Sequence, residues 1–229
     1  MEPGLDLRRL VRTARAIKRL RSRIEVYGVE TVEETFRRWQ ALRLPGLALS
    51  VREHDPEWAD RFARERDRIL PALGAVEIQH FGSTSIPPLP AKDIIDFFVA
   101  VDGPPVTPER VETLAGLGYE LYGNSPVDPE TVWFWSTRAG PCAFAAHVCQ
   151  RGLPWLSTVV NFRDFLRIHP EERRRYEDAK RRLAREEGQD FLGYSVGKMA
   201  LFSELNAKAD AWHASGRGRL GPSHMKQGV

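Results

Sequence analysis

Two neighbouring stretches decide the fold of this chain: VEIQHFGSTSI at residues 76–86 and KDIIDFFV at residues 92–99. The first is a β-type run that ends at a Gly-Ser turn, and the second is an apolar run that carries a carboxylate. Backbone N–H groups of such a turn can hold a phosphate, and an acid on the next strand can hold a divalent metal. We therefore expect a strand–turn–strand unit with a site for a phosphorylated ligand.

Hydrophobic periodicity and turn residues divide the rest of the chain into helices and strands. They predict helices at 5–26, 31–42, 55–73, 107–117, 155–168, 170–187 and 190–213. They predict strands at 47–51, 75–81, 93–101, 119–122, 131–137 and 142–150. Strands grouped between helical ends indicate an α+β fold, that is, an α/β mixed sheet with flanking helices.

The chain divides into three parts. We expect residues 1–45 to form a helical, basic N-terminal extension, residues 46–215 to form the main domain, and residues 216–229, rich in Gly, Ser and Lys, to form a flexible tail. The main domain is helical from about residue 154 onward. A length of 229 residues suffices for one domain with a substantial core and an appendage.

Composition indicates the compartment. No apolar run is long enough for the core of a signal peptide or for a membrane span. Cys142 and Cys149 fall on one predicted strand, which separates them by about 23 Å. A disulfide needs Cα atoms within about 7 Å of each other. We therefore expect free thiols in a cytoplasmic protein.

The N-terminal extension concentrates positive charge. Between residues 5 and 24 there are eight basic residues and one acid, although the whole chain has a net charge of only +3. A basic helix of this kind is suited to RNA, a membrane surface or an acidic partner. The alternative is a solvated helix face, which is common in helical proteins.

Several motifs of the chain resemble the GrpB family. They are VREHDPEW at 51–58, HFGSTSIP at 80–87, LPAK at 89–92, IID at 94–96, FRDFLR at 162–167, HPE at 169–171 and YEDAK at 176–180. The resemblance covers residues 48–212 and leaves out the N-terminal extension. It implies a nucleotidyltransferase-like fold, and a related domain is fused to dephospho-CoA kinase in some bacteria.

The chain also departs from the pattern of that family. PPL at residues 87–89 replaces the usual PGL, and Asp93 stands where a proline is usual. The family often carries two histidines, two positions apart, on a later strand. Here Ala145 occupies the first position and His147 keeps the second.

The metal pair expected of a nucleotidyltransferase is broken. Such an enzyme generally carries an Asp-x-Asp pair on one strand, because residues i and i+2 share a face and hold two metals together. Here Asp93 and Asp96 are three apart, and Ile94 stands two before Asp96. Two interpretations stay open: a transferase that moves a nucleotidyl group to an acceptor, and a binding or regulatory module that has kept the cleft without turnover.

One metal could still be held. We expect Asp96 and His147 to converge from neighbouring strands, with His80 near the mouth of the turn. Mg or Mn is the expected ion, and Zn is a further candidate because imidazole suits it. The alternatives are a hydrogen-bonded strand histidine at His147, a structural residue that fixes the turn at His80, and an Asp96–Lys92 ion pair.

The ligand site is expected at the turn and on a later helix. Gly82, Ser83 and Thr84 supply N–H groups and hydroxyls for a nucleotide or another phosphorylated ligand, with Ser83 and Asp96 as the catalytic pair. Lys92 would add a point charge.

Two arginines fall on one face of the predicted helix at 155–168. Arg163 and Arg167 are spaced i, i+4 and could clamp an acidic ligand. The alternative is that each forms a salt bridge with Asp164, Glu171 or a neighbour.

The aromatic run at residues 133–135 has two interpretations. Strand alternation predicts that Trp133 and Trp135 are buried together and that Phe134 lies on the other face. Core packing is the default interpretation, and a platform for stacking a nucleic acid base is the alternative.

Overall fold

The structure is a computed structural model, and it describes residues 51–74, 76–124, 130–136, 140, 142–186, 194 and 197–216. The predicted N-terminal extension at 1–45 lies outside these residues. So do nearly all of the predicted strand at 47–51 and of the predicted tail at 216–229.

The described helices and strands are those that the sequence predicts. The helices are α4 (Glu57–Leu73), α5 (Pro108–Gly116), α6 (Pro154–Ile168), α7 (Pro170–Glu186) and α9 (Met199–Ala214), with a short 3-10 turn, η1 (Ser83–Ser85). The strands are β1 (Glu77–Phe81), β2 (Ile94–Val101), β3 (Tyr119–Asn124), β4 (Thr131–Ser136) and β5 (Ala143–Gln150). Boundaries shift by at most two residues, apart from the start of α9.

Helix α4 shows how the sequence sets a boundary. The Asp55 carboxylate accepts the N–H of Glu57 at 2.9 Å, and Pro56 occupies the turn between them. A carboxylate at this position satisfies an N–H that the helix itself leaves unpaired. At the other end Gly74 adopts a φ of +76° and donates its N–H to the carbonyl of Leu70.

The five strands form one mixed sheet in the order β1-β2-β5-β4-β3. β1 is antiparallel to β2, β2 is parallel to β5, and β4 is antiparallel to both of its neighbours. The parallel pair requires a crossover, and α5, β3 and β4 form it. The predicted α+β fold is confirmed.

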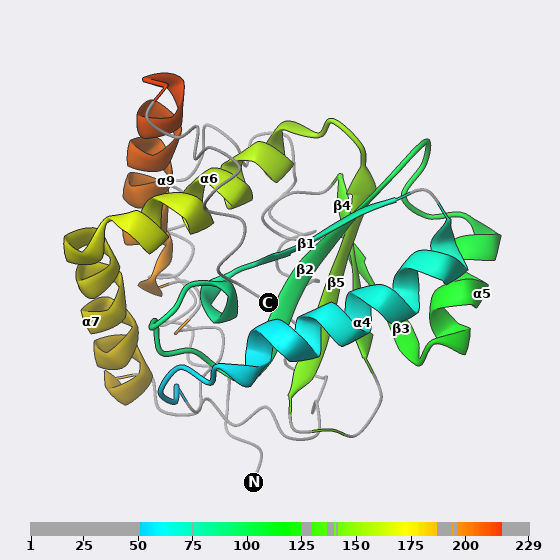
Figure 1. The fold of residues 1–229 in the computed structure, drawn as a ribbon, viewed down its shortest axis with the longest axis horizontal. Helices are drawn as coiled ribbons and strands as arrows, with labels where there is room; N and C mark the ends of the chain where they lie inside the picture. The colour runs from blue at the N-terminus through cyan, green and yellow to red at the C-terminus, as the bar shows by residue number, and fades with distance from the viewer. Residues whose placement is uncertain are drawn as a thin grey trace, which may run out of the picture.

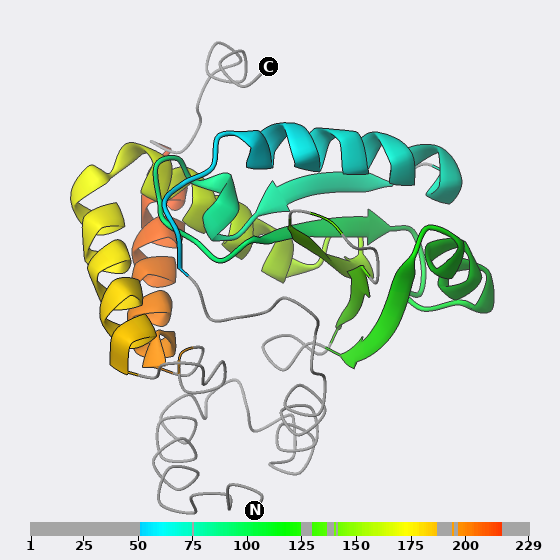
Figure 2. The same cartoon turned by 90° about the horizontal axis from the view of Figure 1, so that it is seen from below.

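The two faces of the sheet are covered differently. On one face α4 runs along the sheet (Figure 2), and residues of α4 and α5 pack on the strands in the main hydrophobic core. This core includes Trp58, Ile69 and Leu114, all fully buried. On the other face Leu156 and Val159 of α6 pack on β1, β2 and β5.

The last three helices form a second packed unit. Figure 1 shows α6, α7 and α9 together at one end of the molecule, with α5 at the opposite end. Their apolar sides meet the segment after the turn, where Ile86 and Leu89 are fully buried against Phe162 and Leu205. The turn is thereby held between the sheet and the helical unit.

The aromatic run on β4 is placed differently from the prediction. Trp133 and Trp135 share a face, as predicted, but they are only half-buried, and Phe134 is 1% exposed in the main core. The predicted burial was wrong because α4 and α5 cover the face of Phe134, whereas α6 covers only part of the other face.

Two further expectations concern cysteines and membrane insertion. Cys142 and Cys149 are both buried and are not joined by a disulfide, as predicted. None of the helices in the described ranges is long and apolar enough to cross a membrane.

Candidate functional site

The turn after β1 is in direct contact with the acid on β2. Gly82 has a φ of +71°, a conformation that favours glycine. A Cβ atom at this position would lie 2.8 Å from Asp96 Oδ2, which is closer than real Cβ contacts. Glycine is therefore needed twice, for the backbone angle and for the approach of the carboxylate.

Asp96 meets His147 across the parallel pair of strands. Asp96 Oδ1 lies 3.4 Å from His147 Nε2, and the two side chains are 33% and 6% exposed. The imidazole is enclosed by three aromatic rings: Phe81 and Trp133 contact it edge-on, and Trp155 stacks on it. Its Nδ1 is buried with no hydrogen-bond partner in the described part of the chain. The structure therefore brings Asp96 and His147 together from neighbouring strands, as predicted.

This pair could hold a metal only with help from the ligand. Two donors at roughly 2.1 Å from one tetrahedral ion lie about 3.4 Å apart, and this is the separation of Asp96 Oδ1 and His147 Nε2. Among the described residues no group of three or more His, Cys, Asp and Glu side chains is placed to hold a metal. An ion here would take its remaining oxygen ligands from water and phosphate, as Mg²⁺ commonly does.

His80 does not join this pair. It lies on the opposite face of the sheet, where it is paired in register with Phe97 and stacks on Phe62 at 4.8 Å. The Thr84 hydroxyl donates to the carbonyl of Ile94, so its oxygen accepts a hydrogen bond from His80 Nε2 at 2.9 Å. That nitrogen then carries a proton and has no lone pair for a metal.

Burial controls the protonation of His80. It lowers the pKa of the ring to about 3, so His80 is neutral near pH 7. The predicted three-residue metal set is thus not brought together, and His80 is placed as the residue that fixes the turn.

Asp93 has a separate, structural environment. Its carboxylate accepts hydrogen bonds from Arg52 at 2.6 Å and from the indole N–H of Trp58 at 3.0 Å. Asp93 and Asp96 therefore do not form a metal pair. This agrees with their spacing of three residues, which predicts that they face opposite sides of the strand. The position two before Asp96 is Ile94, which is 7% exposed.

The two arginines of α6 hold the turn. Arg163 donates to the carbonyl of His80 at 2.9 Å and pairs with Asp164 at 2.7 Å. Arg167 donates twice to the carbonyl of Ser85, at 2.9 and 2.7 Å. Arg167 also lies 3.5 Å from Asp164, so the salt-bridge alternative holds for both arginines, and both guanidinium groups lie against the backbone on either side of the turn.

Three lysines gather beside the turn, and the sequence predicted only one of them. Lys92 Nζ lies 5.0 Å and Lys198 Nζ 5.5 Å from the ring centre of Tyr194, and Lys180 Nζ donates to the carbonyl of Pro90. Lys180 is 2% exposed. Helical spacing could have found it: α7 buries Tyr176 and Leu183, and Lys180 lies between them at i+4 and i−3.

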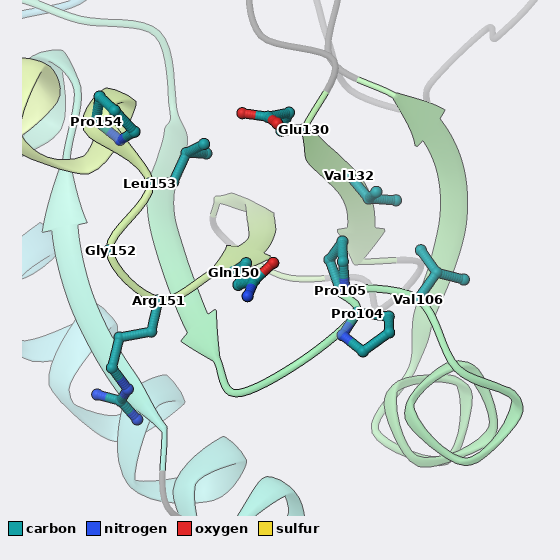
Figure 3. Close-up of a pocket in the computed structure, with 10 residues that line it drawn as sticks. All are labelled: Pro104, Pro105, Val106, Glu130, Val132, Gln150, Arg151, Gly152, Leu153 and Pro154. Atoms are coloured by element: carbon teal, nitrogen blue, oxygen red, sulfur yellow. The ribbon is translucent and has the colours of Figure 1, made fainter.

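A separate cavity of about 620 Å³ lies elsewhere in the fold. Figure 3 shows its lining from three places: the loop after β2, strand β4, and the segment that joins β5 to α6. It is at the far end of β2 from Asp96, because five residues of strand span roughly 16 Å. This cavity is therefore not part of the site at the turn.

The mixed sheet, its flanking helices and the acid beside the turn define an α+β protein, which is consistent with the nucleotidyltransferase-like fold that the family resemblance implies. The family model described as "GrpB protein" matches residues 48–208. The chain belongs to the GrpB family, so the predicted resemblance is confirmed.

Individual relatives agree with this assignment. A UPF0157 protein of Streptomyces coelicolor is 34% identical over 166 residues, which are 72% of this chain and 86% of that protein. The crystal structure of the conserved protein GrpB from Enterococcus faecalis superimposes with a TM-score of 0.61 at 28% identity, covering 71% of this chain and 99% of that one. A dephospho-CoA kinase of Mycolicibacterium paratuberculosis is 27% identical over 183 residues, and this similarity spans only 45% of that kinase.

Proposed function

We propose that this protein binds a nucleotide, or another phosphorylated ligand, together with a divalent metal at Asp96 and His147. The observation that carries the proposal is the 3.4 Å approach of Asp96 Oδ1 to His147 Nε2 beside the Gly82 turn. Asp96 is one-third exposed and His147 is almost completely buried, so the carboxylate reaches solvent while the imidazole is held rigidly. Mg²⁺ or Mn²⁺ fits this donor set when phosphate oxygens complete it, and Zn²⁺ fits the imidazole.

Ser83 is the turn residue best suited to contact the phosphate. The Thr84 hydroxyl is engaged with His80 and Ile94, and the Ser85 hydroxyl donates to the carbonyl of Gly82 at 2.7 Å. Within the described ranges, Ser83 is the one turn hydroxyl without a partner in the protein. We infer that Thr84 and Ser85 shape the turn and that Ser83 contacts the ligand.

The half-buried indoles of β4 offer a surface for a nucleoside base. Trp133 and Trp135 are on the same face of the sheet as Asp96, since Trp135 and Asp96 both pair with Ala145 in register. Stacking on aromatic side chains is favourable for any base, because every base has a π-face. This placement supports a nucleotide over a ligand without a base.

The test is calorimetric titration of the full chain with a nonhydrolysable nucleoside triphosphate in the presence of Mn²⁺. Asp96→Asn keeps the shape of the side chain and removes its charge, and we expect it to weaken binding at least tenfold. The matched control is Asp102→Asn, which changes an acid that is 75% exposed just past the far end of β2. If the unmodified protein binds no nucleotide, or if both variants bind like it, the proposal is wrong.

Nucleotidyl transfer to an acceptor is the enzymatic form of this proposal. Asp96 would then hold the metal, and Ser83 with the turn amides would hold the phosphates. Ile94 favours binding without turnover, because the position that should carry the second carboxylate is apolar and 7% exposed. Incubation with α-labelled nucleoside triphosphates and Mn²⁺ separates the two: label transferred by the unmodified chain supports an enzyme, whereas binding without release of pyrophosphate supports a regulatory module.

A further inference from the structure

The parallel strands β2 and β5 end side by side, and the chain then leaves them towards opposite faces of the sheet. Val101 and Gln150, the last residues of the two strands, are paired in register. After β2 the next helix is α5, whose Leu114 packs in the main core, and after β5 it is α6, whose Leu156 packs on the other face. In open sheets, a change of face between neighbouring parallel strands leaves a crevice outside their carboxyl ends, and ligands commonly bind there.

The cavity of about 620 Å³ lies at this change of face. One wall is the loop after β2, at residues 104–106, and another is the segment into α6, at residues 151–154. Glu130 and Val132, at the start of β4, close a third side (Figure 3). Sites for small molecules commonly enclose about 300–1,000 Å³. The strand connections and the cavity therefore indicate the same place.

Hydrogen bonds hold the walls of the cavity in position. Arg110 of α5 donates to the carbonyl of Asp102 at 2.9 Å and to that of Pro104. The N–H of Arg151 donates to the carbonyl of Val101 at 2.8 Å, which joins the second wall to the end of β2. Prolines in both walls fix their own backbone angle φ. A ligand that enters a site with fixed walls has little loop ordering to offset.

The lining combines apolar walls with hydrogen-bond acceptors. In Figure 3 the side chains of Glu130 and Gln150 lie around the same space as the apolar ones, whereas the side chain of Arg151 extends away. Arg151 binds Asp102 instead, at 2.9 Å. A carboxylate accepts up to about four hydrogen bonds, so Glu130 can bind a ligand donor in addition to its contacts within the protein. The apolar lining residues are Pro104, Pro105, Val106, Val132, Leu153 and Pro154.

We propose that this cavity is a second ligand site and that its ligand is a small primary amine with an apolar body. The ammonium group has three donors, which suit the carboxylate of Glu130 and the amide oxygen of Gln150. The apolar body contacts the proline rings and Leu153. This site goes beyond the proposed function, because it lies at the opposite end of β2 from Asp96 and uses no residue of the nucleotide site.

Three indole compounds test the class of the ligand. Tryptamine, tryptophol and indole-3-propionate carry an ammonium, a hydroxyl and a carboxylate on the same chain of the same ring. Each is titrated to 5 mM into the full chain labelled with nitrogen-15, and the amide signal of Gly152 reports binding in the cavity. Because Glu130 is exposed, its charge contributes modestly, so tryptamine should bind roughly two- to fivefold more tightly than tryptophol. Indole-3-propionate should bind most weakly.

Two variants locate the binding. Val106 lines the cavity and is 39% exposed, so Val106→Trp can fill the space with little disturbance of the core. The matched control is Ile168→Trp, at the end of α6, where the side chain is 42% exposed. We expect Val106→Trp to weaken tryptamine binding at least tenfold and Ile168→Trp to change it less than twofold. Glu130→Gln keeps the shape of the side chain and should remove the preference for tryptamine over tryptophol.

The proposal is overturned if tryptamine does not shift the Gly152 signal in a saturable way, or if Val106→Trp binds it as Ile168→Trp does. Equal binding of tryptamine and tryptophol, or tighter binding of indole-3-propionate, would refute the amine as the ligand. Val106→Trp should bind nucleotide as the unmodified protein does. The cavity and the nucleotide site can therefore fail separately.

Discussion

Gly82 is the residue on which the geometry of the turn depends most directly. An alanine there would adopt an unfavourable positive φ and would place its Cβ 2.8 Å from Asp96 Oδ2. Gly103 has a similar φ of +76°, but nothing lies within 4 Å of its Cβ position. Gly103→Ala should therefore cost only the backbone strain, of order 1–3 kcal/mol, and Gly82→Ala should cost more and should also weaken nucleotide binding.

Urea unfolding of both alanine variants measures this difference. Both variants lose free energy of unfolding through the unfavourable backbone angle. The additional loss in Gly82→Ala therefore reports the contact with Asp96. Equal destabilisation of the two variants would contradict the close approach that the structure shows.

His80 should make the stability of the protein depend on pH. Its pKa in the folded protein is about 3, below the ordinary value of 6.5, because burial disfavours the charged ring. Between these two pH values the unfolded chain binds more protons than the folded protein. The contribution of His80 to the free energy of unfolding is therefore fully present above pH 6.5 and is lost as the pH drops towards 3. The slope should approach about 1.4 kcal/mol per pH unit.

Unfolding in urea at a series of pH values checks the His80 prediction. His80→Gln keeps a polar group for Thr84 and should remove most of the slope, while His213→Gln, on the last turn of α9, should leave it unchanged. Burial also lowers the pKa of His54, so a smaller slope of the same sign remains. A profile for His80→Gln identical to that of the unmodified protein would refute a buried neutral ring.

Residue patterns predicted the approach of Asp96 to His147 but not the position of His80 on the opposite face of the sheet. Asp96 and His147 were predictable, because an acid inside an apolar strand needs a partner and neighbouring strands supply one. The face on which His80 lies depends on strand register, and a shift of one residue reverses it. The approach of Lys198 to the ring of Tyr194, which Lys92 also contacts, was not predictable, because it depends on how α9 packs.

At the scale of elements, α6 connects the sheet to the turn. Arg167 makes two charge-assisted hydrogen bonds to the carbonyl of Ser85. Arg167→Met should lower stability by about 1–3 kcal/mol, because the buried carbonyl loses its donors. Arg66→Met is the control: Arg66 pairs with its neighbour Asp67 on the surface, where both side chains are exposed, and such pairs contribute little.

The same pair of variants separates the two interpretations of the arginines. If Arg167 holds the turn, Arg167→Met lowers the midpoint of thermal unfolding in the absence of any ligand. If Arg167 instead clamps an acidic ligand, the midpoint without ligand stays unchanged and only nucleotide binding falls. The hydrogen bonds to Ser85 favour the first outcome.

Element boundaries were predictable because the sequence marks them locally. Asp55-Pro56 begins α4, and glycines end it and α5. The burial of the aromatic side chains on β4 was not predictable from the sequence, because alternation shows only which side chains share a face. Whether that face is covered depends on where α6 packs, and α6 begins 18 residues after the end of β4.

At the scale of the whole molecule, charge is divided unevenly along the chain. Residues 5–24 carry eight basic residues and one acid, a net +7, and the whole chain carries +3. The remainder therefore has a net charge of −4. An association with RNA or another acidic partner should depend on the N-terminal extension rather than on the main domain.

Removal of residues 1–45 should abolish a salt-sensitive association with RNA. The measurement is fluorescence anisotropy of a labelled single-stranded RNA of mixed sequence, with the full chain and with residues 46–229, between 50 and 200 mM KCl. For the full chain, the logarithm of affinity should fall with the logarithm of salt concentration by roughly 0.7 for each phosphate contacted. A full-length variant with Arg8, Arg12, Arg15 and Arg19 changed to Gln keeps the length and should lose most of that slope. If the shortened chain binds RNA with the same slope as the full chain, the main domain carries the contact, and the lysines beside Tyr194 become the next group to neutralise.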